Sequence, residues 1–293
     1  MPAQKNLISA FLLRPAMKYA DLHIHTHFSD STFSPEEVVK LAHKNHLSAI
    51  SITDHDTVDA IDPAIKYAEG FSIEIIPGIE LTAEVDNREV HILGYFIDHH
   101  DERFLAKLKD LRRVRVTRIH EMVKRLKQQG IKKIDADEVV NKAGKAAVGR
   151  VHLAMALKRH GLVSSISEAF QKHIGDSCPA YVSKFKLSPQ EAIKLILQAK
   201  GVPVLAHPYT LDRDELIPDF AKDGLMGLEV YYPEYTQRVI SHYKALCQKL
   251  HLLATGGSDD HGKAKETILM GKIKISYELV ERLKQAKDKI HGS

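Results

Sequence analysis

The amino-acid sequence predicts an α/β protein with a mainly parallel sheet and an inserted helical subdomain. Short apolar segments alternate with amphipathic helical segments in both the first and the last third of the chain. Such repeats build parallel sheets with right-handed crossovers, either open or closed into a barrel. By contrast, residues 101–174 contain no convincing strand. Apolar residues make up 44% of the chain, which is enough to bury a sizeable core.

The first third of the chain has the stronger strand and helix signals. Ser34-Pro35-Glu36-Glu37 combines an N-cap serine, a first-turn proline and a capping-box glutamate, which predicts the start of a helix. Val38, Val39, Leu41 and Ala42 would form its buried face. The other elements expected here are strands over 19–25, 47–53 and 73–76, a helix over 60–68, and a strand pair over 79–85 and 89–97.

The last third repeats this pattern. Ser188-Pro189-Gln190-Glu191 again caps a helix, which we expect to run to about Lys200. The other elements expected here are strands over 202–206, 227–231 and 252–255 and helices over 211–223 and 235–251.

Between these parts, apolar residues from Leu105 to Leu126 mark a long basic helix, and shorter helical patterns follow it. We therefore expect a helical subdomain over residues 101–175, inserted into an α/β domain formed by 19–100 and 176–293. Its role would be either structural or that of a cap that recognises substrate. Residues 1–18 are expected to be a flexible extension.

Composition excludes several classes of protein. Forty-two Lys and Arg against thirty-eight Asp and Glu give a net charge of +4, too small for a nucleic-acid-coating tail. No apolar run approaches the ~18 residues of a membrane span, and nothing indicates secretion, so we expect a cytoplasmic protein without membrane contact. The two cysteines lie in unrelated contexts, so neither a disulfide framework nor a CxxC metal site is expected.

Histidine is the unusual residue, with eighteen copies, several of them at or near strand ends. In a β/α fold such ends share one rim, so their side chains would converge. His23 and His25, two residues apart on a strand, would share one face. About six imidazoles and three carboxylates exceed one tetrahedral zinc site and suit two or three bridged ions of manganese, iron or zinc. The imidazoles are those of His23, His25, His55, His91, His207 and His261, and the carboxylates would come from among Asp21, Asp30, Asp54, Asp56, Glu80, Asp259 and Asp260.

The order of these segments resembles the PHP (polymerase and histidinol phosphatase) family. The segments DLHIHT, TDHD, PGIE, VHILGY, LAHP and GSDDH follow one another as the motifs of that family do, from Tyr19 onward. The resemblance implies a distorted (β/α)7 barrel with an inserted helical subdomain. The relatives it suggests are stand-alone phosphoesterases that act on nucleoside 3′,5′-bisphosphates or trim RNA from the 5′ end.

The resemblance also implies a trinuclear metal site, most simply of manganese. His23, His25, Glu80 and Asp259 would hold one ion, and Asp30, His55 and His261 a second. Glu80 would bridge to a third ion, held also by His91 and His207. Asp21, Asp54 and Asp56 would orient ligand imidazoles, although Asp54 could equally cap a helix.

Three further residues would bind a second substrate phosphate outside the metal cluster. Arg150 and His152 open a predicted helix, whose amino end favours anions. The resemblance implies that Lys184 also lies near the second phosphate, as the corresponding residue does in the relatives. The alternative for all three is ordinary solvated charge.

The function implied is hydrolysis of a phosphomonoester of a nucleoside 3′,5′-bisphosphate such as pAp. RNA 5′ ends are a further substrate class, and a hydroxide shared by two ions would attack in line. The expected partner is a small phosphorylated nucleotide or short RNA, with no obligate protein partner evident. One alternative is histidinol-phosphate phosphatase. A metal-dependent amidohydrolase usually has a bridging Lys where this chain has Glu80, and a non-enzymatic PHP module should have lost ligands.

Overall fold

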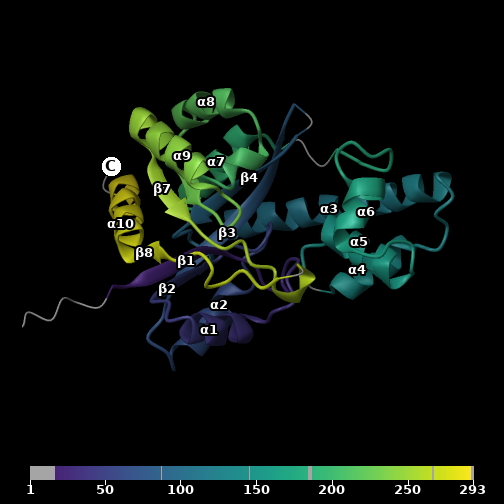
Figure 1. The fold of residues 1–293 in the computed structure, drawn as a ribbon, viewed down its shortest axis with the longest axis horizontal. Helices are drawn as coiled ribbons and strands as arrows, with labels where there is room; N and C mark the ends of the chain where they lie inside the picture. The colour runs from purple at the N-terminus through teal and green to yellow at the C-terminus, as the bar shows by residue number, and fades with distance from the viewer. Residues whose placement is uncertain (1–16, 87, 145, 184–186, 266, 292–293) are drawn as a thin grey trace, which may run out of the picture.

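Eight strands form a single sheet in the order β7-β6-β5-β4-β3-β2-β1-β8 (Figure 1). The structure is a computed structural model and describes residues 17–291 except 87, 145, 184–186 and 266. The strands are β1 (Tyr19–Ile24), β2 (Ala49–Ile52), β3 (Glu74–Val85), β4 (Arg88–Tyr95), β5 (Val202–Leu205), β6 (Gly227–Tyr231), β7 (Leu253–Gly256) and β8 (Ile275–Ser276).

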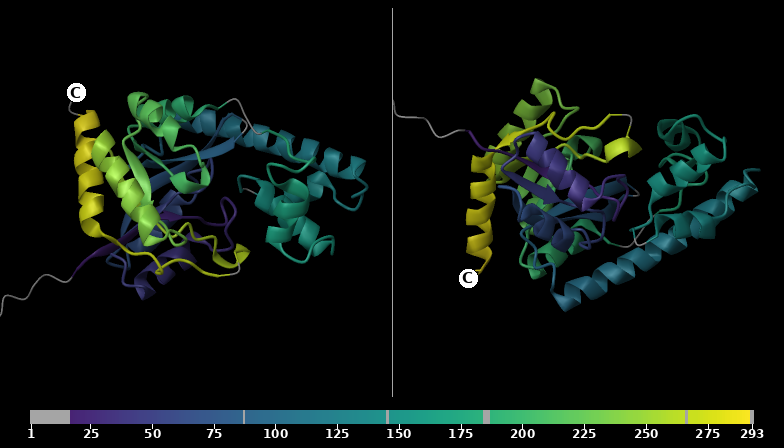
Figure 2. Two further views of the ribbon diagram at one scale, coloured as in Figure 1. Left: turned by 45° about the horizontal axis from the view of Figure 1, so that its top comes forward. Right: turned by 90° about the horizontal axis from the view of Figure 1, so that it is seen from below.

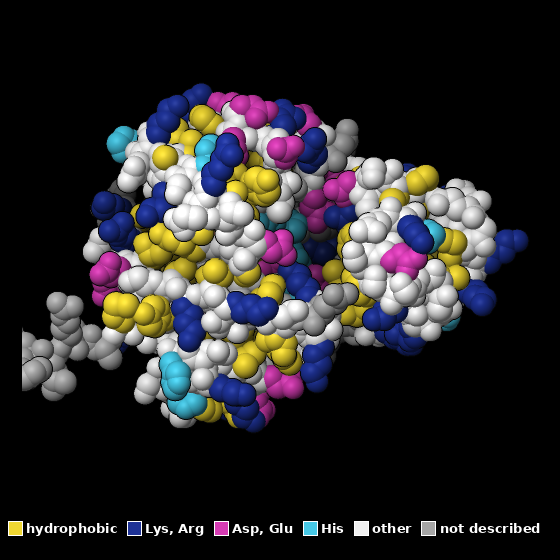
Figure 3. All heavy atoms as spheres, viewed as in Figure 1, with side chains coloured by type: hydrophobic (Ala, Val, Ile, Leu, Met, Phe, Trp, Pro, Cys, Tyr) yellow, Lys and Arg dark blue, Asp and Glu magenta, His cyan; other side chains and the backbone are white. Residues whose placement is uncertain are grey.

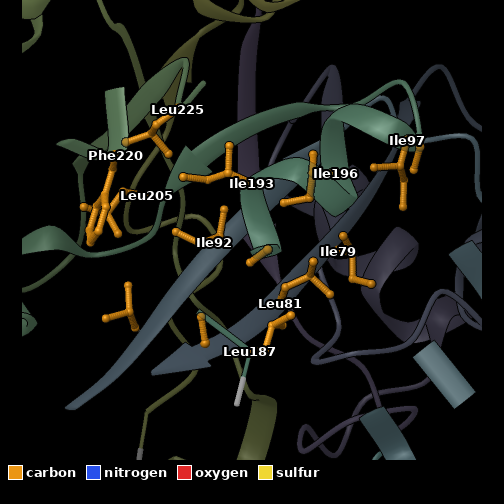
Figure 4. Packing of buried hydrophobic residues seen from close by; sticks show 14 of the residues in the cluster. Ile79, Leu81, Ile92, Ile97, Leu187, Ile193, Ile196, Leu205, Phe220 and Leu225 are labelled. Carbon is orange, nitrogen blue, oxygen red and sulfur yellow. The ribbon is translucent and has the colours of Figure 1, made fainter. Parts of the chain in front are cut away.

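Helices follow most of these strands, and several of the ten helices in the described residues cover the sheet. They are α1 (Pro35–Lys44), α2 (Ile61–Ala68), α3 (Glu102–Gln128), α4 (Ala136–Ala143), α5 (Arg150–Arg159), α6 (Ile166–Ala169), α7 (Pro189–Gln198), α8 (Ile217–Lys222), α9 (Gln237–Leu250) and α10 (Tyr277–His291). Both predicted capping boxes are present, at Ser34 with Glu37 and at Ser188 with Glu191. Figure 4 shows Ile193 and Ile196 of α7 beside Ile79 and Ile92 of the sheet.

The sheet is parallel within β1–β3 and within β5–β7, while β4 runs antiparallel to both of its neighbours. The two strands expected over 73–76 and 79–85 form one continuous strand, β3. Gly78 allows this, because a Cβ there would lie 2.2 Å from Ser51 Oγ of the neighbouring β2. The chain can therefore pass Pro77 and Gly78 without leaving the sheet.

The segment after β7 closes the sheet against β1. The Asp259 amide donates to the His23 carbonyl at 2.8 Å, and the His25 amide donates to the Asp260 carbonyl at 3.0 Å. A Cβ on Gly257 would lie 2.4 Å from the backbone nitrogen of His23, so only glycine allows this approach. The distorted barrel expected from the resemblance is confirmed.

The far half of α3 and helices α4 to α6 lie to one side of the barrel and have a separate apolar core, whereas the first half of α3 packs in the core of the barrel. The far half of α3 extends beyond the barrel and carries α4, α5 and α6 beside it (Figure 2). Ile119 and Met122 of α3 pack there against Leu153 and Leu157 of α5. A π-helical turn, η1 (Phe170–Ile174), follows α6. We call residues 101–175 the helical insert; its boundaries as a separate domain stay a prediction.

The structure departs from the expected elements near the C-terminus. The helix expected over 211–223 is limited to α8, because Asp212 adopts a left-handed φ of 53° and short 3₁₀ turns precede Ile217. Strand β8 and helix α10 were not predicted; α10 packs on the barrel through Val280, Leu283 and Ala286. Within the described residues, no helix combines the length and apolarity of a membrane span.

We expect Gly257→Ala to destabilise the barrel, since the new methyl would collide with backbone atoms of β1. Overpacking of this kind costs about 1–3 kcal/mol. Urea unfolding of the metal-stripped protein would measure the change in the free energy of unfolding. Gly70→Ala is the matched control, because a methyl group added there would meet no atom within 4 Å. Equal effects of the two substitutions would contradict the proposed closure.

Candidate metal centre

Glu80 of β3 lies at the middle of the cluster predicted from the sequence. One of its oxygens, Oε2, lies 3.1 Å from His55 Nδ1, 3.2 Å from His25 Nε2 and 3.4 Å from His23 Nε2. The other, Oε1, lies 2.9 Å from His91 Nδ1 and 3.3 Å from His207 Nε2. The side chain is buried. A single carboxylate thus contacts five imidazoles, which come from β1, β4 and the segments that follow β1, β2 and β5.

Two further carboxylates complete the cluster. Asp259 Oδ1 lies 3.1 Å from His25 Nε2 and 3.4 Å from His23 Nε2. Asp30 Oδ1 lies 3.3 Å from His261 Nε2, and Asp30 Oδ2 lies 3.7 Å from His55 Nε2. The structure therefore brings all nine predicted ligand residues together.

The donor atoms fit divalent cations. Three groups of cluster residues each bring one donor atom per residue within 4.8 Å of one another: His23, His25 and Glu80; His25, Asp30, His55 and His261; and His55, Glu80 and His91. His55 Nδ1 and Glu80 Oε2 are buried and have no hydrogen-bond partner among the described residues. Buried polar atoms are normally satisfied, and a cation shared between them would satisfy both.

Charges within the cluster outweigh burial for most of its members. Burial raises the pKa of Asp30, but His261 and His55 hold that pKa well below its usual value. Burial lowers the pKa of His25, but Asp259 and Glu80 raise it to about 10. At His55 burial outweighs the neighbouring carboxylates and holds the pKa well below its ordinary value. A neutral imidazole is the form that binds a metal ion.

Two residues of the cluster adopt backbone conformations that are rare for side chains other than glycine. His207 has a φ of 26° and Asp259 a φ of 50°. Asp56, which follows His55, has a φ of 52°. Such conformations cost of order 1–3 kcal/mol and gather at functional sites.

Sequence reasoning missed Glu229 of β6, which is fully buried. Its Oε1 lies 2.9 Å from His23 Nδ1, and its Oε2 accepts a hydrogen bond from the His207 amide at 2.8 Å. Glu229 therefore supports two of the predicted ligands at once. A lone acid in the apolar strand GLEVY was the available signal.

The three aspartates expected to orient imidazoles accept hydrogen bonds from other groups instead. Asp54 accepts hydrogen bonds from Thr26 and from Ser29 Oγ, and the N-cap of α2 is Ala60, so Asp54 does not cap that helix. Asp21 accepts from the Ser258 amide at 2.8 Å. Asp56 accepts from Arg115 Nε at 2.6 Å.

A cavity of about 340 Å³ opens onto the cluster, in the hollow between the barrel and the helical insert (Figure 3). Arg115 and Arg150 contribute cations to its wall, and Lys265, which sequence reasoning missed, contributes a third. Val151, Ile166 and Phe170 of the insert form an apolar part of the same wall.

The predicted substrate-binding residues differ in position. Arg150 faces the cavity, and its guanidinium pairs with Glu89 and Asp176. His152 does not line the cavity; its Nδ1 accepts a hydrogen bond from the Gly149 amide at 3.2 Å. Lys184 lies outside the described residues.

Substitution of Glu80 by Gln should lower bound metal severalfold, because the amide removes the negative charge shared by five imidazoles. Metal analysis of protein reloaded with manganese and desalted would measure this. Asp62→Asn is the control: Asp62, His99 and His100 form another candidate group, but Asp62 and His100 are mostly exposed. Equal metal loss in both variants would argue against the Glu80 cluster.

A family model described as the PHP domain matches residues 21–173. The chain is 32% identical to the 5′-3′ exoribonuclease Rnm of Escherichia coli (strain K12), over 82% of this chain and 84% of that protein. It is 29% identical to a 3′,5′-nucleoside bisphosphate phosphatase of Chromobacterium violaceum, over 84% of this chain and 88% of that one.

Two other similarities agree on phosphoester chemistry. A phosphoribosyl 1,2-cyclic phosphate 1,2-diphosphodiesterase of Eggerthella lenta is 27% identical over 83% of this chain and 94% of that protein. A crystal structure of a candidate metal-dependent phosphoesterase from Bifidobacterium adolescentis superimposes with a TM-score of 0.83. It is 31% identical, and the match covers 92% of this chain and 96% of that one.

Proposed function

The chain belongs to the PHP domain family and is a metal-dependent phosphoesterase, and we propose that it hydrolyses a phosphomonoester of a nucleoside 3′,5′-bisphosphate. The names of its bacterial relatives span exoribonuclease, bisphosphate phosphatase and cyclic phosphodiesterase, so similarity alone does not choose the substrate. The observation that carries the proposal is the composition of the cavity wall opposite the metal cluster.

That wall offers two kinds of contact that a bisphosphate nucleotide needs. Arg150 would bind the phosphate that is not cleaved, in the bidentate manner that guanidinium groups favour. Phe170 and Ile166 offer an apolar surface for a base. A volume of about 340 Å³ lies within the range of small-molecule sites.

The same wall disfavours histidinol phosphate. That substrate has one phosphate and a positively charged amine, so it offers no second phosphate to Arg150 and adds a cation near Arg115 and Lys265. Like charges brought together in a partly buried site cost binding free energy.

We propose that the nine cluster residues hold two or three divalent ions, with manganese as the first ion to test. Bound ions would supply an acidified water molecule and neutralise the oxygens of the scissile phosphate. Lys265 Nζ donates to Asp259 Oδ2 at 2.9 Å, which fixes that carboxylate from the cavity side. Asp56 and Thr82 fix Arg115, whose charge faces the same cavity.

The 5′ ends of short RNA are the second candidate substrate, supported by the name of the Escherichia coli relative. The basic run of α3 adds little support, since Arg115 and Arg118 point inward and are buried. We therefore place the free bisphosphate first.

The test is phosphate release from adenosine 3′,5′-bisphosphate by protein stripped of metal and reloaded with manganese. We expect release that depends on the metal and falls by at least about 100-fold in His23→Ala, which removes a cluster imidazole. Histidinol phosphate and a 5′-phosphorylated oligoribonucleotide serve as competing substrates. A higher kcat/KM for either would replace the proposed substrate.

Arg150→Ala should discriminate between one and two phosphates. We expect kcat/KM to fall about 10-fold or more for adenosine 3′,5′-bisphosphate and by less than about twofold for p-nitrophenyl phosphate, which has a single phosphate. Lys158→Ala, an exposed cation on the same helix, is the control and should change neither value. A uniform loss on both substrates would contradict the assignment of Arg150.

A further inference from the structure

We propose that Glu89 is a positioning residue that links the arginines of the helical insert to the metal centre through His91. The inference rests on the metal role of His91 proposed above. Glu89 and His91 lie two residues apart on β4, so their side chains share one face of the strand. Their contact is direct, since Glu89 Oε1 lies 2.9 Å from His91 Nε2.

Glu89 fixes which nitrogen of His91 faces the metal centre. His91 Nδ1 lies 2.9 Å from Glu80 Oε1 at the middle of the cluster. A ligand nitrogen must offer a lone pair, so the ring proton of a metal-bound His91 would reside on Nε2. The Glu89 carboxylate accepts that proton in a hydrogen bond, which fixes the tautomer and makes Nδ1 a stronger donor.

The second oxygen of Glu89 contacts two arginines of the helical insert. Glu89 Oε2 lies 3.2 Å from Arg150 Nη2 and 3.6 Å from Arg118 Nη1. Arg118 is buried, and its Nε also donates to the Val182 carbonyl at 2.8 Å. One carboxylate therefore balances two guanidinium groups of the insert while it supports a ligand of the barrel.

Asp176 is a second counter-ion of Arg150 and provides a matched control for Glu89. It pairs with Arg150 Nη1, whereas Glu89 pairs with Nη2, and its side chain is 53% exposed. Within the described residues, Asp176 forms an ion pair with Arg150 and none with His91. Glu89 and Asp176 thus share one partner and differ in the contact on which the proposal depends.

This arrangement makes the cation site and the anion site interdependent. An anion that binds Arg150 changes the charge around Glu89 Oε2. A cation that binds His91 changes the charge around Glu89 Oε1. By linkage, each ligand must change the affinity of the other by the same factor.

The test is calorimetric titration of manganese into the metal-stripped full chain, which requires no substrate. We expect Glu89→Gln to weaken manganese binding by about 10-fold or more at one class of site, since lost second-layer partners typically cost that much. Asp176→Asn removes the other counter-ion of Arg150 without touching His91, so it should change manganese affinity far less than Glu89→Gln does. Equal manganese affinities in the two variants would overturn the proposal.

Two further variants separate the possible failures. If His91→Ala leaves manganese binding unchanged, the metal role of His91 is wrong and the premise falls. If His91→Ala weakens binding and Glu89→Gln does not, only the role of Glu89 is overturned. Glu89→Asp retains the negative charge but shortens the side chain that contacts His91, so it should also weaken manganese binding. This variant replaces Glu89→Gln in the test if urea unfolding shows that Glu89→Gln is unfolded.

Discussion

The structure depends on the burial of one carboxylate, that of Glu80, among five imidazoles from separate parts of the barrel rim. An isolated buried charge is very costly, so the surrounding groups must supply positive charge and hydrogen bonds. The imidazoles surround the carboxylate of Glu80. Asp259 receives positive charge from Lys265 and a hydrogen bond from the Tyr232 hydroxyl. Glu229 and Glu89 then support the imidazoles from outside. The rim of the barrel thus gathers buried carboxylates and imidazoles in groups that could hold divalent cations.

That arrangement requires backbones to approach more closely than side chains normally allow. Gly78 lets β3 pass β2, and Gly257 lets the final segment lie against β1. His207 and Asp259 accept left-handed conformations that place their side chains in the cluster. These local costs are tolerated because the surrounding hydrogen bonds determine the position of each residue.

Much of this could be read from the sequence, because its signals are local. Ser34-Pro35 and Ser188-Pro189 marked helices through caps, and apolar segments that end in His or Asp marked the rim. Glu229 could not be assigned in this way, since its partner His23 lies 206 residues away. Arg115 and Arg118 belong to a run of charge that reads as solvated, and only tertiary packing turns them inward. The direction of β4 likewise depends on pairing with β5, across the whole helical insert.

The contact between β1 and the segment after β7, which we call the seam of the barrel, has a consequence for the stability of the protein without metal. His23 and His25 lie on one side of the seam, and Asp259 and His261 on the other. An ion bound by both sides would act as a clasp between segments more than 200 residues apart, much as a crosslink closes a long loop. Without metal, the backbone hydrogen bonds of the seam alone would hold these segments together, so the metal-free protein would be less stable and more readily cut by proteases than the metal-bound form.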